Sequence, residues 1–182
     1  MNRVLVEGDI EFDFSAAVCA ERFDDEEKHK LSHCFKRIDF LVEWPDSLWL
    51  VEVKDPSSGR IPPECREGKK DDFLDELKSQ TLFSKALAPK LKDSFLYLHL
   101  NDELPPKPLK YFVFIGLGEL DDAMLGHNST LLKRHCCLTG PDGEGWRNPY
   151  ITNAMVFNEK SWNRTLPRCP VRRLIVSGRL KM

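Results

Sequence analysis

The sequence predicts an α/β protein in which a mixed central β-sheet is flanked by helices on both faces. Short alternating apolar stretches predict strands, and the continuous apolar run over residues 111–117 is typical of a strand covered on both sides. Helical patterns separate these strands, which favours the mixed arrangement. The chain has 182 residues, 41% hydrophobic and 31% charged, so we expect a single domain over residues 1–182 with a real core.

Composition excludes some classes of protein. The formal net charge of −2 argues against binding nucleic acid through bulk charge, although it leaves a local basic groove open. No apolar run approaches about 18 residues, and no basic leader precedes an apolar segment. We therefore expect a cytoplasmic protein without membrane contact. The six cysteines form no C-x-x-C pair and are expected to be free thiols.

The N-terminal half is expected to be rich in strands. Alternation predicts strands near residues 4–6 and 10–14. A short helix over 15–24 follows, although the same residues also alternate passably as a strand. Two strands over 36–44 and 48–54 are then joined by a tight turn at Pro45-Asp46.

The C-terminal half should alternate helices with strands. The proline, glycine and serine content of residues 55–70 predicts a mobile surface loop that could fold over a substrate, and a helix should start at Asp71 or Asp72. Pro89 should interrupt or kink that helix. Beyond it we expect a helix over 91–100, the buried strand 111–117, a helix over 121–137, a loop over 139–149, and strands over 151–157 and 171–176.

Three charged residues stand out on the hairpin over 36–54. If the turn spans residues 44–47, paired residues have numbers summing to 91, and Asp39 lies opposite Glu52. A three-residue loop would instead make the two acids diagonal neighbours. Period-two alternation puts Lys54 on their face. The opposite face should carry Ile38, Phe40, Val42, Trp49, Val51 and Val53.

Two opposed carboxylates repel each other, and charge on an apolar hairpin is costly unless something binds it. Mg²⁺, or Mn²⁺ in its place, relieves the repulsion and keeps several waters. Such a metal activates water and neutralises charge on a phosphate, which is the chemistry of phosphodiester hydrolysis. Lys54 could orient the water or stabilise the transition state.

The pattern Asp39-x12-Glu52-Val53-Lys54, on a strand–turn–strand followed by a helix, resembles the PD-(D/E)XK nuclease superfamily. This resemblance implies a restriction-endonuclease-like fold. It implies Asp39, Glu52 and the Val53 carbonyl as metal ligands, and Lys54 as the catalytic lysine.

The resemblance also implies two outer residues. Many members add an acid from the helix before the hairpin, for which Glu21 is the best match, with Glu11 behind it. Many add a glutamine or lysine from the next helix, for which Gln80 fits. The likeness covers about residues 10–117. It departs in placing Ile38 before the aspartate, where proline is usual, and in showing two strands where the family has three.

The sequence thus predicts a metal-dependent nuclease, with DNA preferred to RNA as the partner. The alternative is a non-catalytic nuclease-like scaffold that serves as an interaction or nucleic-acid-binding subunit, and a homodimer or a partner subunit stays open. The acids could also belong to an ordinary solvated hairpin face. His127 with His135-Cys136-Cys137 lacks the spacing of a zinc site and is interpreted as core or cap.

Overall fold

The computed structural model describes residues 3–29, 33–141 and 143–174, which form two β-sheets and several helices. The smaller sheet has the order β1 (Val4–Glu7), β2 (Ile10–Asp13), β8 (Val171–Arg173). The larger sheet has the order β3 (Cys19–Arg22), β4 (Phe40–Glu43), β5 (Leu48–Lys54), β6 (Leu109–Ile115), β7 (Ile151–Phe157). β3, β4 and β5 pair antiparallel, whereas β5, β6 and β7 pair parallel. The predicted α/β class with a mixed sheet is confirmed.

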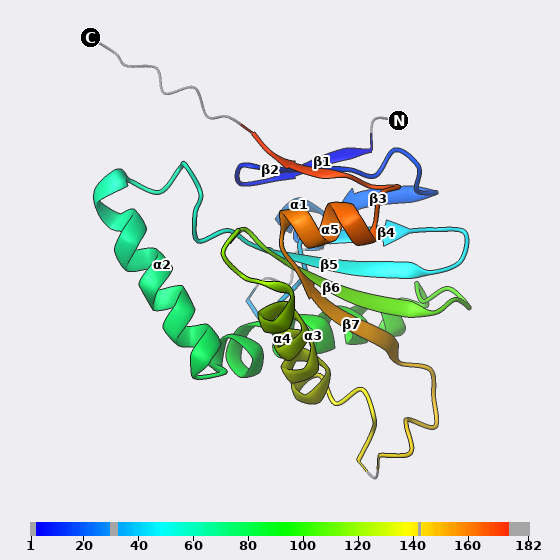
Figure 1. Cartoon of the computed structure of the whole chain (residues 1–182). Coiled ribbons are helices and arrows are strands. Elements are labelled where there is room, and N and C mark those ends of the chain that lie inside the picture. The colour runs from blue at the N-terminus through cyan, green and yellow to red at the C-terminus, as the bar shows by residue number, and fades with distance from the viewer. Residues whose placement is uncertain (1–2, 30–32, 142, 175–182) are drawn as a thin grey trace.

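Different layers cover the two faces of the larger sheet (Figure 1). The smaller sheet and α5 (Glu159–Thr165) lie over one face, and α3 (Ala88–Leu100) and α4 (Asp122–His135) lie over the other. Helices therefore lie on both faces as expected, but one covering layer is mainly a second sheet, which the sequence did not predict. The apolar side chains of Ile10, Phe12 and Val171 on that sheet are buried, so it can close a core as a helix would.

The two sides of the larger sheet have cores of different composition. Between the sheets the core is aromatic, and the rings of Phe12 and Trp162 meet edge to face with centroids 5.2 Å apart. On the helix side the core is mainly aliphatic and includes Leu50, Leu91 and Val113. β5 and β6 contribute to both cores, so the strand predicted over 111–117 is covered on both sides as expected, although it spans Leu109–Ile115 and ends two residues earlier.

The predicted helix over residues 15–24 was wrong. Residues 19–22 form β3, which pairs with β4 so that Glu21 lies opposite Leu41. The stretch fitted both periods, and pairing with β4 decided between them because tertiary context overrides weak local preference. The short helix α1 (Glu26–His29) follows β3.

The loop after β5 is shorter than expected. Helix α2 (Pro63–Lys78) begins with proline in its first turn, where the missing N–H is not needed, so residues 63–70 are helical. The remaining loop over 55–62 is anchored, because Ser58 Oγ donates to Asp9 Oδ2 at 2.7 Å and Arg173 pairs with Asp55 at 2.7 Å. In Figure 1, α2 stands away from the rest of the molecule.

Pro89 does not interrupt the helical segment. A π-helix, η1 (Leu82–Leu87), runs directly into α3, and the Ala88 N–H donates to the carbonyl of Phe83, five residues back. Pro89 has no N–H, so the carbonyl of Lys85, four residues earlier, lacks its usual helical donor. That carbonyl accepts from Lys36 Nζ at 3.1 Å instead. The break lies earlier, at Gln80, whose φ is 62°.

The later elements largely match expectation. α4 follows its cap, Asp121, whose side chain accepts from the Met124 N–H, and β7 spans the predicted residues. β8 ends at Arg173, and residues 175–176 of the predicted strand lie outside the described residues. All six cysteines are free thiols. Within the described ranges, no helix has the length and apolar character needed to cross a bilayer.

Candidate functional site: a buried carboxylate–lysine cluster

The hairpin has the predicted register. Phe40 pairs with Val51 and Leu41 with Leu50, so the numbers sum to 91. The Trp44 N–H donates to the Ser47 carbonyl at 2.8 Å, which closes the four-residue turn. This arrangement excludes the three-residue loop and its diagonal pairing of the acids.

Asp39 lies one residue before β4 and is held against β5. Its N–H donates to the Val51 carbonyl at 3.1 Å, and its Oδ2 accepts the Val53 N–H at 2.6 Å. Its carbonyl accepts from the Phe23 N–H at 2.8 Å, on the side of β3. The bonds to Val51 and Val53 lie on either side of Glu52, so Asp39 is fixed beside that glutamate.

The expected position of Ile38 was wrong. The other residues of its predicted face lie between the two sheets, but Ile38 belongs to the helix-side core, and its N–H donates to Ser94 Oγ on α3 at 3.0 Å. Strand alternation does not reach it because β4 begins only at Phe40.

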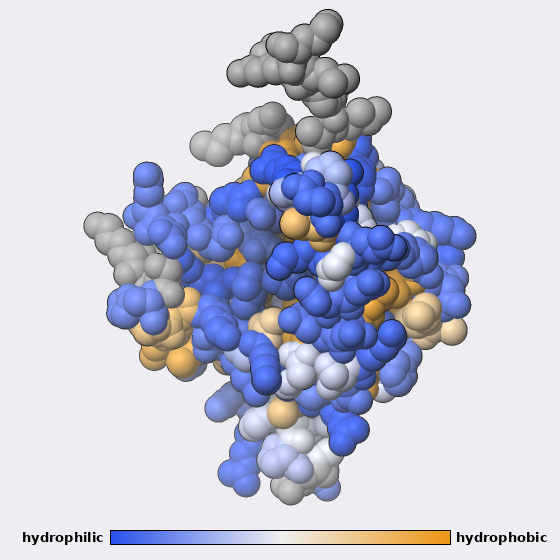
Figure 2. Space-filling view, turned by 90° about the vertical axis from the view of Figure 1, so that its left-hand side faces the viewer, coloured by the Kyte–Doolittle hydropathy of each residue, from blue (hydrophilic) through white to orange (hydrophobic). Residues whose placement is uncertain are grey.

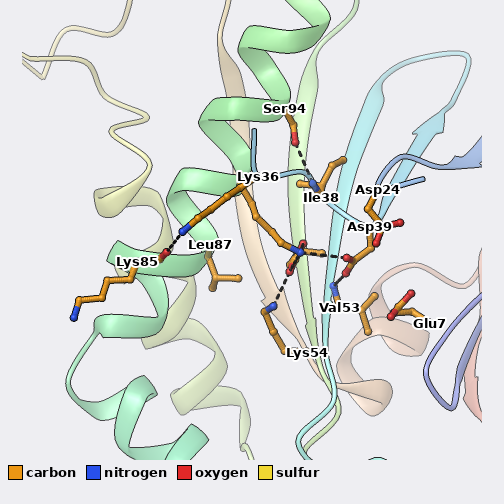
Figure 3. A network of polar contacts seen from close by, with 12 residues as sticks. Glu7, Asp24, Lys36, Ile38, Asp39, Val53, Lys54, Lys85, Leu87 and Ser94 are labelled. Carbon is orange, nitrogen blue, oxygen red and sulfur yellow. Dashed lines mark hydrogen bonds and ion pairs between the residues drawn. The ribbon is translucent and has the colours of Figure 1, made fainter. Parts of the chain in front are cut away.

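A fourth side chain, Lys90 of α3, joins the three predicted residues. Its Nζ lies 2.7 Å from Glu52 Oε1 and 3.3 Å from Asp39 Oδ1. Lys54 Nζ lies 2.8 Å from the same Glu52 oxygen. We call Asp39, Glu52, Lys54 and Lys90 the carboxylate–lysine cluster. Figure 3 shows Asp39, Val53 and Lys54 in this network beneath α3.

Burial sets the electrostatics of the cluster. Glu52 is 0% exposed and Asp39 5%, whereas the side chains of Lys54 and Lys90 are 28% and 22% exposed. Burial, followed by the nearby charge of Glu52, raises the pKa of Asp39 to about 7 against the pull of Lys90. Burial alone would lower the pKa of Lys90, but the Glu52 and Asp39 carboxylates outweigh it and raise that pKa. The two buried carboxylates thus contact the ammonium groups of two lysines whose side chains are partly exposed.

The carboxylate pair fits a hard divalent cation. The Lys90 ammonium shows that oxygens of both acids can contact one positive centre. Carboxylate oxygens are the ligands that Mg²⁺ and Mn²⁺ favour. Within the described residues, no three His, Cys, Asp or Glu side chains gather as a metal site. The Val53 carbonyl and waters would therefore have to complete the coordination.

The outer predicted residues lie in other surroundings. Glu21 comes from a strand rather than from a helix, and it lies opposite Leu41, two residues along from Asp39. Glu11, on the smaller sheet, accepts from Arg172 Nε at 2.6 Å. Gln80 Oε1 lies 3.2 Å from His135 Nε2 on α4. The structure therefore brings together Asp39, Glu52 and Lys54 with the backbone of Val53, and it leaves Glu11 and Gln80 bonded elsewhere.

Only part of the cysteine–histidine segment lies in the core, because Cys137 and His127 are exposed. Cys136 is buried, and burial raises its pKa to about 12. The His135 ring stacks on Phe83 with centroids 5.9 Å apart. A thiol that resists ionisation is a poor metal ligand, which agrees with the interpretation made from spacing.

Sequence reasoning missed the role of Lys90, which it treated only as part of a basic surface cluster. A signal was present, because Lys90 falls on the same helical stripe as the buried residues Leu87 and Ser94. A lysine on an apolar stripe needs a buried partner.

Comparison of the chain with protein-family models, with curated proteins and with solved structures gave no match.

Proposed function

We propose that this protein is a metal-dependent nuclease of PD-(D/E)XK type that hydrolyses phosphodiester bonds of nucleic acid, with DNA preferred to RNA. One observation carries the proposal: two buried carboxylates, Asp39 and Glu52, contact a common cation, and Lys54 shares their face. Burying two acids side by side is costly, and such an arrangement is more typical of a functional site than of a stabilising one.

The order of elements supports a restriction-endonuclease-like fold. β3 supplies the third antiparallel strand that the hairpin alone does not provide, so three antiparallel strands of the larger sheet precede α2. The next strand, β6, joins that sheet parallel to β5. One departure persists among the described residues: the hairpin β1–β2 precedes β3 where the family has a helix.

In this proposal Asp39, Glu52 and the Val53 carbonyl hold Mg²⁺ or Mn²⁺. The bound metal supplies an activated water and neutralises charge on the phosphate. Lys54, whose side chain is 28% exposed, holds the attacking water or the developing charge. Figure 2 views the molecule from the side of α2 and shows mainly hydrophilic residues, among which a charged substrate can bind. α2 exposes Arg66 and Lys69 for phosphate contacts.

A second candidate is the non-catalytic nuclease-like scaffold. The specific observation in its favour is that Lys90 already occupies the cation position, so the carboxylates are paired without metal. In that case the protein would bind nucleic acid or a partner subunit and cleave nothing.

A cleavage assay on DNA and RNA, single- and double-stranded, with Mg²⁺ or Mn²⁺, tests the first candidate. We expect metal-dependent cleavage by the wild type and a loss of about 100-fold or more in Asp39→Asn and Lys54→Met, because the first removes a charged metal ligand and the second removes the ammonium that holds the water or the developing charge. Circular dichroism should show both variants folded.

The hairpin offers matched controls at its other end, where Lys107 Nζ contacts Glu43 at 2.6 Å. Glu43→Gln and Lys107→Met make the same chemical changes away from the cluster and should cleave at the wild-type rate. Absence of metal-dependent cleavage by the wild type on every substrate would contradict the enzyme and favour the scaffold.

A further inference from the structure

We propose that Lys90 is a built-in competitor for the divalent metal: its ammonium holds the cation position in the metal-free protein, and a metal ion binds only by displacing it. This inference rests on the proposed metal site at Asp39 and Glu52. It adds a regulation of that site, because metal affinity is then set by a side chain of the protein.

The contacts of Lys90 are those of a cation bound between two acids. Its Nζ lies 2.7 Å and 2.9 Å from the two oxygens of Glu52 and 3.3 Å from Asp39 Oδ1. A Mg²⁺ ion shared by both acids would need oxygens of the same carboxylates, at about 2.0–2.1 Å. An ammonium and a dication at one place repel strongly, so the two occupants exclude each other.

The fold directs Lys90 to this position through the joint between η1 and α3. Two donors from outside the helix bind carbonyls of the joint: Lys36 Nζ contacts the Lys85 carbonyl at 3.1 Å, and Tyr111 Oη contacts the Leu87 carbonyl at 3.1 Å. Figure 3 shows Lys36 reaching across to Lys85 in this way. The widened π-turn of η1 ends just before Lys90, and such turns are frequent at functional sites.

The same bonds couple the joint to the metal ligands. Lys36 lies three residues before Asp39, and its N–H donates to Asp93 Oδ2 of α3 at 2.9 Å. Tyr111 lies on β6 beside Leu50 of β5, the strand that carries Glu52. The start of α3 is therefore fixed against both segments that supply carboxylates, which places the ammonium between them.

Displacement of Lys90 needs no change of fold. Its side chain is 22% exposed, so the flexible stem can turn the ammonium toward solvent. Without Lys90 or metal, the pair keeps only the Lys54 ammonium, which contacts Glu52. A metal ion and the Lys90 ammonium would thus each neutralise the two carboxylates of the folded protein, and either one should stabilise the fold when the other is absent.

Calorimetric titration with Mn²⁺, in the absence of nucleic acid, tests this exchange. We expect Lys90→Gln to bind Mn²⁺ about tenfold or more tightly than the wild type, because an adjacent positive charge is removed. In EDTA the variant should unfold at a lower temperature than the wild type, and Mn²⁺ should restore it. Lys92→Gln, the same change on the exposed side of the same helix, should behave as the wild type does.

The outcomes separate this inference from the proposed function. Equal Mn²⁺ affinity in the wild type and Lys90→Gln would overturn the competition and leave the nuclease proposal standing. Absence of Mn²⁺ binding in both would overturn the competition and the metal site together. If Lys90→Gln fails to fold, Lys90→Arg decides, since a guanidinium pairs more firmly with carboxylates and should weaken Mn²⁺ binding. Unchanged or tighter binding in Lys90→Arg would overturn the proposal.

Discussion

Two aspartates of this protein are both almost inaccessible to solvent, yet they behave in opposite ways. Asp9 is 2% exposed and Asp39 5%. Burial would raise the pKa of Asp9, but hydrogen bonds from Ser58 and Gly59 and the charge of Arg60 outweigh it and lower that pKa. At Asp39, burial and a neighbouring carboxylate raise the pKa to about 7. The ionised form of the carboxyl is thus favoured at Asp9 and disfavoured at Asp39.

The difference lies in how deeply each carboxylate is buried and in what faces it, because Asp39 lies deeper among protein atoms than Asp9 does. Asp9 Oδ2 accepts from the Ser58 hydroxyl and from the Gly59 N–H, and its Oδ1 contacts Arg60 Nε at 3.1 Å. Among the residues that the structure describes, no second acid contacts those donors. Asp39 has one backbone donor, Val53, and shares its ammonium with Glu52. Asp9 therefore anchors the loop over 55–62. The groups around Asp39 do not fully offset its negative charge, so an additional cation such as a metal ion would be favoured there.

The largest expected effect on stability comes from removing the charge of the anchoring aspartate. Asp9→Asn replaces an acceptor-only carboxylate by an amide, so part of its bonding to Ser58, Gly59 and Arg60 is lost. We expect the free energy of unfolding to fall by about 2 kcal/mol at pH 7. Urea denaturation in EDTA measures it.

The effect of Asp9→Asn should depend on pH in a defined direction. The folded pKa of Asp9 lies below the unfolded value near 3.8, so its contribution is fully present above about pH 4 and is lost as the pH falls further. The difference between wild type and variant should shrink below about pH 4. A difference that stays constant into acid would show that the charge of Asp9 contributes nothing.

The same substitution at Asp39 should have the opposite sign. Asp39→Asn keeps an oxygen to accept the Val53 N–H and leaves Lys90 paired with Glu52, while it removes one of two crowded charges. In metal-free protein at pH 8 we expect an unchanged free energy of unfolding or a gain of up to about 1 kcal/mol. Urea denaturation measures it beside Asp9→Asn, and a loss comparable to that variant's would make Asp39 a structural anchor.

The hairpin could be predicted from the sequence because its determinants are local. Pro45 in the turn and the alternation of residues 48–54 specify the register, and the register puts Asp39 beside Glu52. β3 was not predictable in the same way, because residues 19–22 fit two periods and only β4 decides between them. The start of α2 could have been predicted from the sequence, since Pro63 after Pro62 is typical of a first helical turn, but the glycine and serine before it favoured a loop.

Lys90 illustrates what local patterns cannot supply. It lies 38 residues from Glu52, and the two meet only because α3 packs on the sheet through Leu91 and Leu98. No spacing rule links a helix residue to a strand residue at that separation. The pattern predicts the carboxylates and Lys54, whereas packing determines which cation faces them.

The smallest effect should come from the exposed part of the Asp9 anchor. The Arg60 side chain is 67% exposed, so its ion pair with Asp9 is screened by water, and we expect Arg60→Met to lower the free energy of unfolding by about 0.5 kcal/mol or less. Ser58→Ala, at a residue that is 8% exposed, should cost about 1 kcal/mol because a buried donor is lost. Urea denaturation of the two variants ranks them. If Arg60→Met lowered the free energy of unfolding more than Ser58→Ala, the positive charge of Arg60 would stabilise the Asp9 carboxylate more than the buried hydroxyl does. The two aspartates would then differ only in their depth of burial and in the second carboxylate beside Asp39.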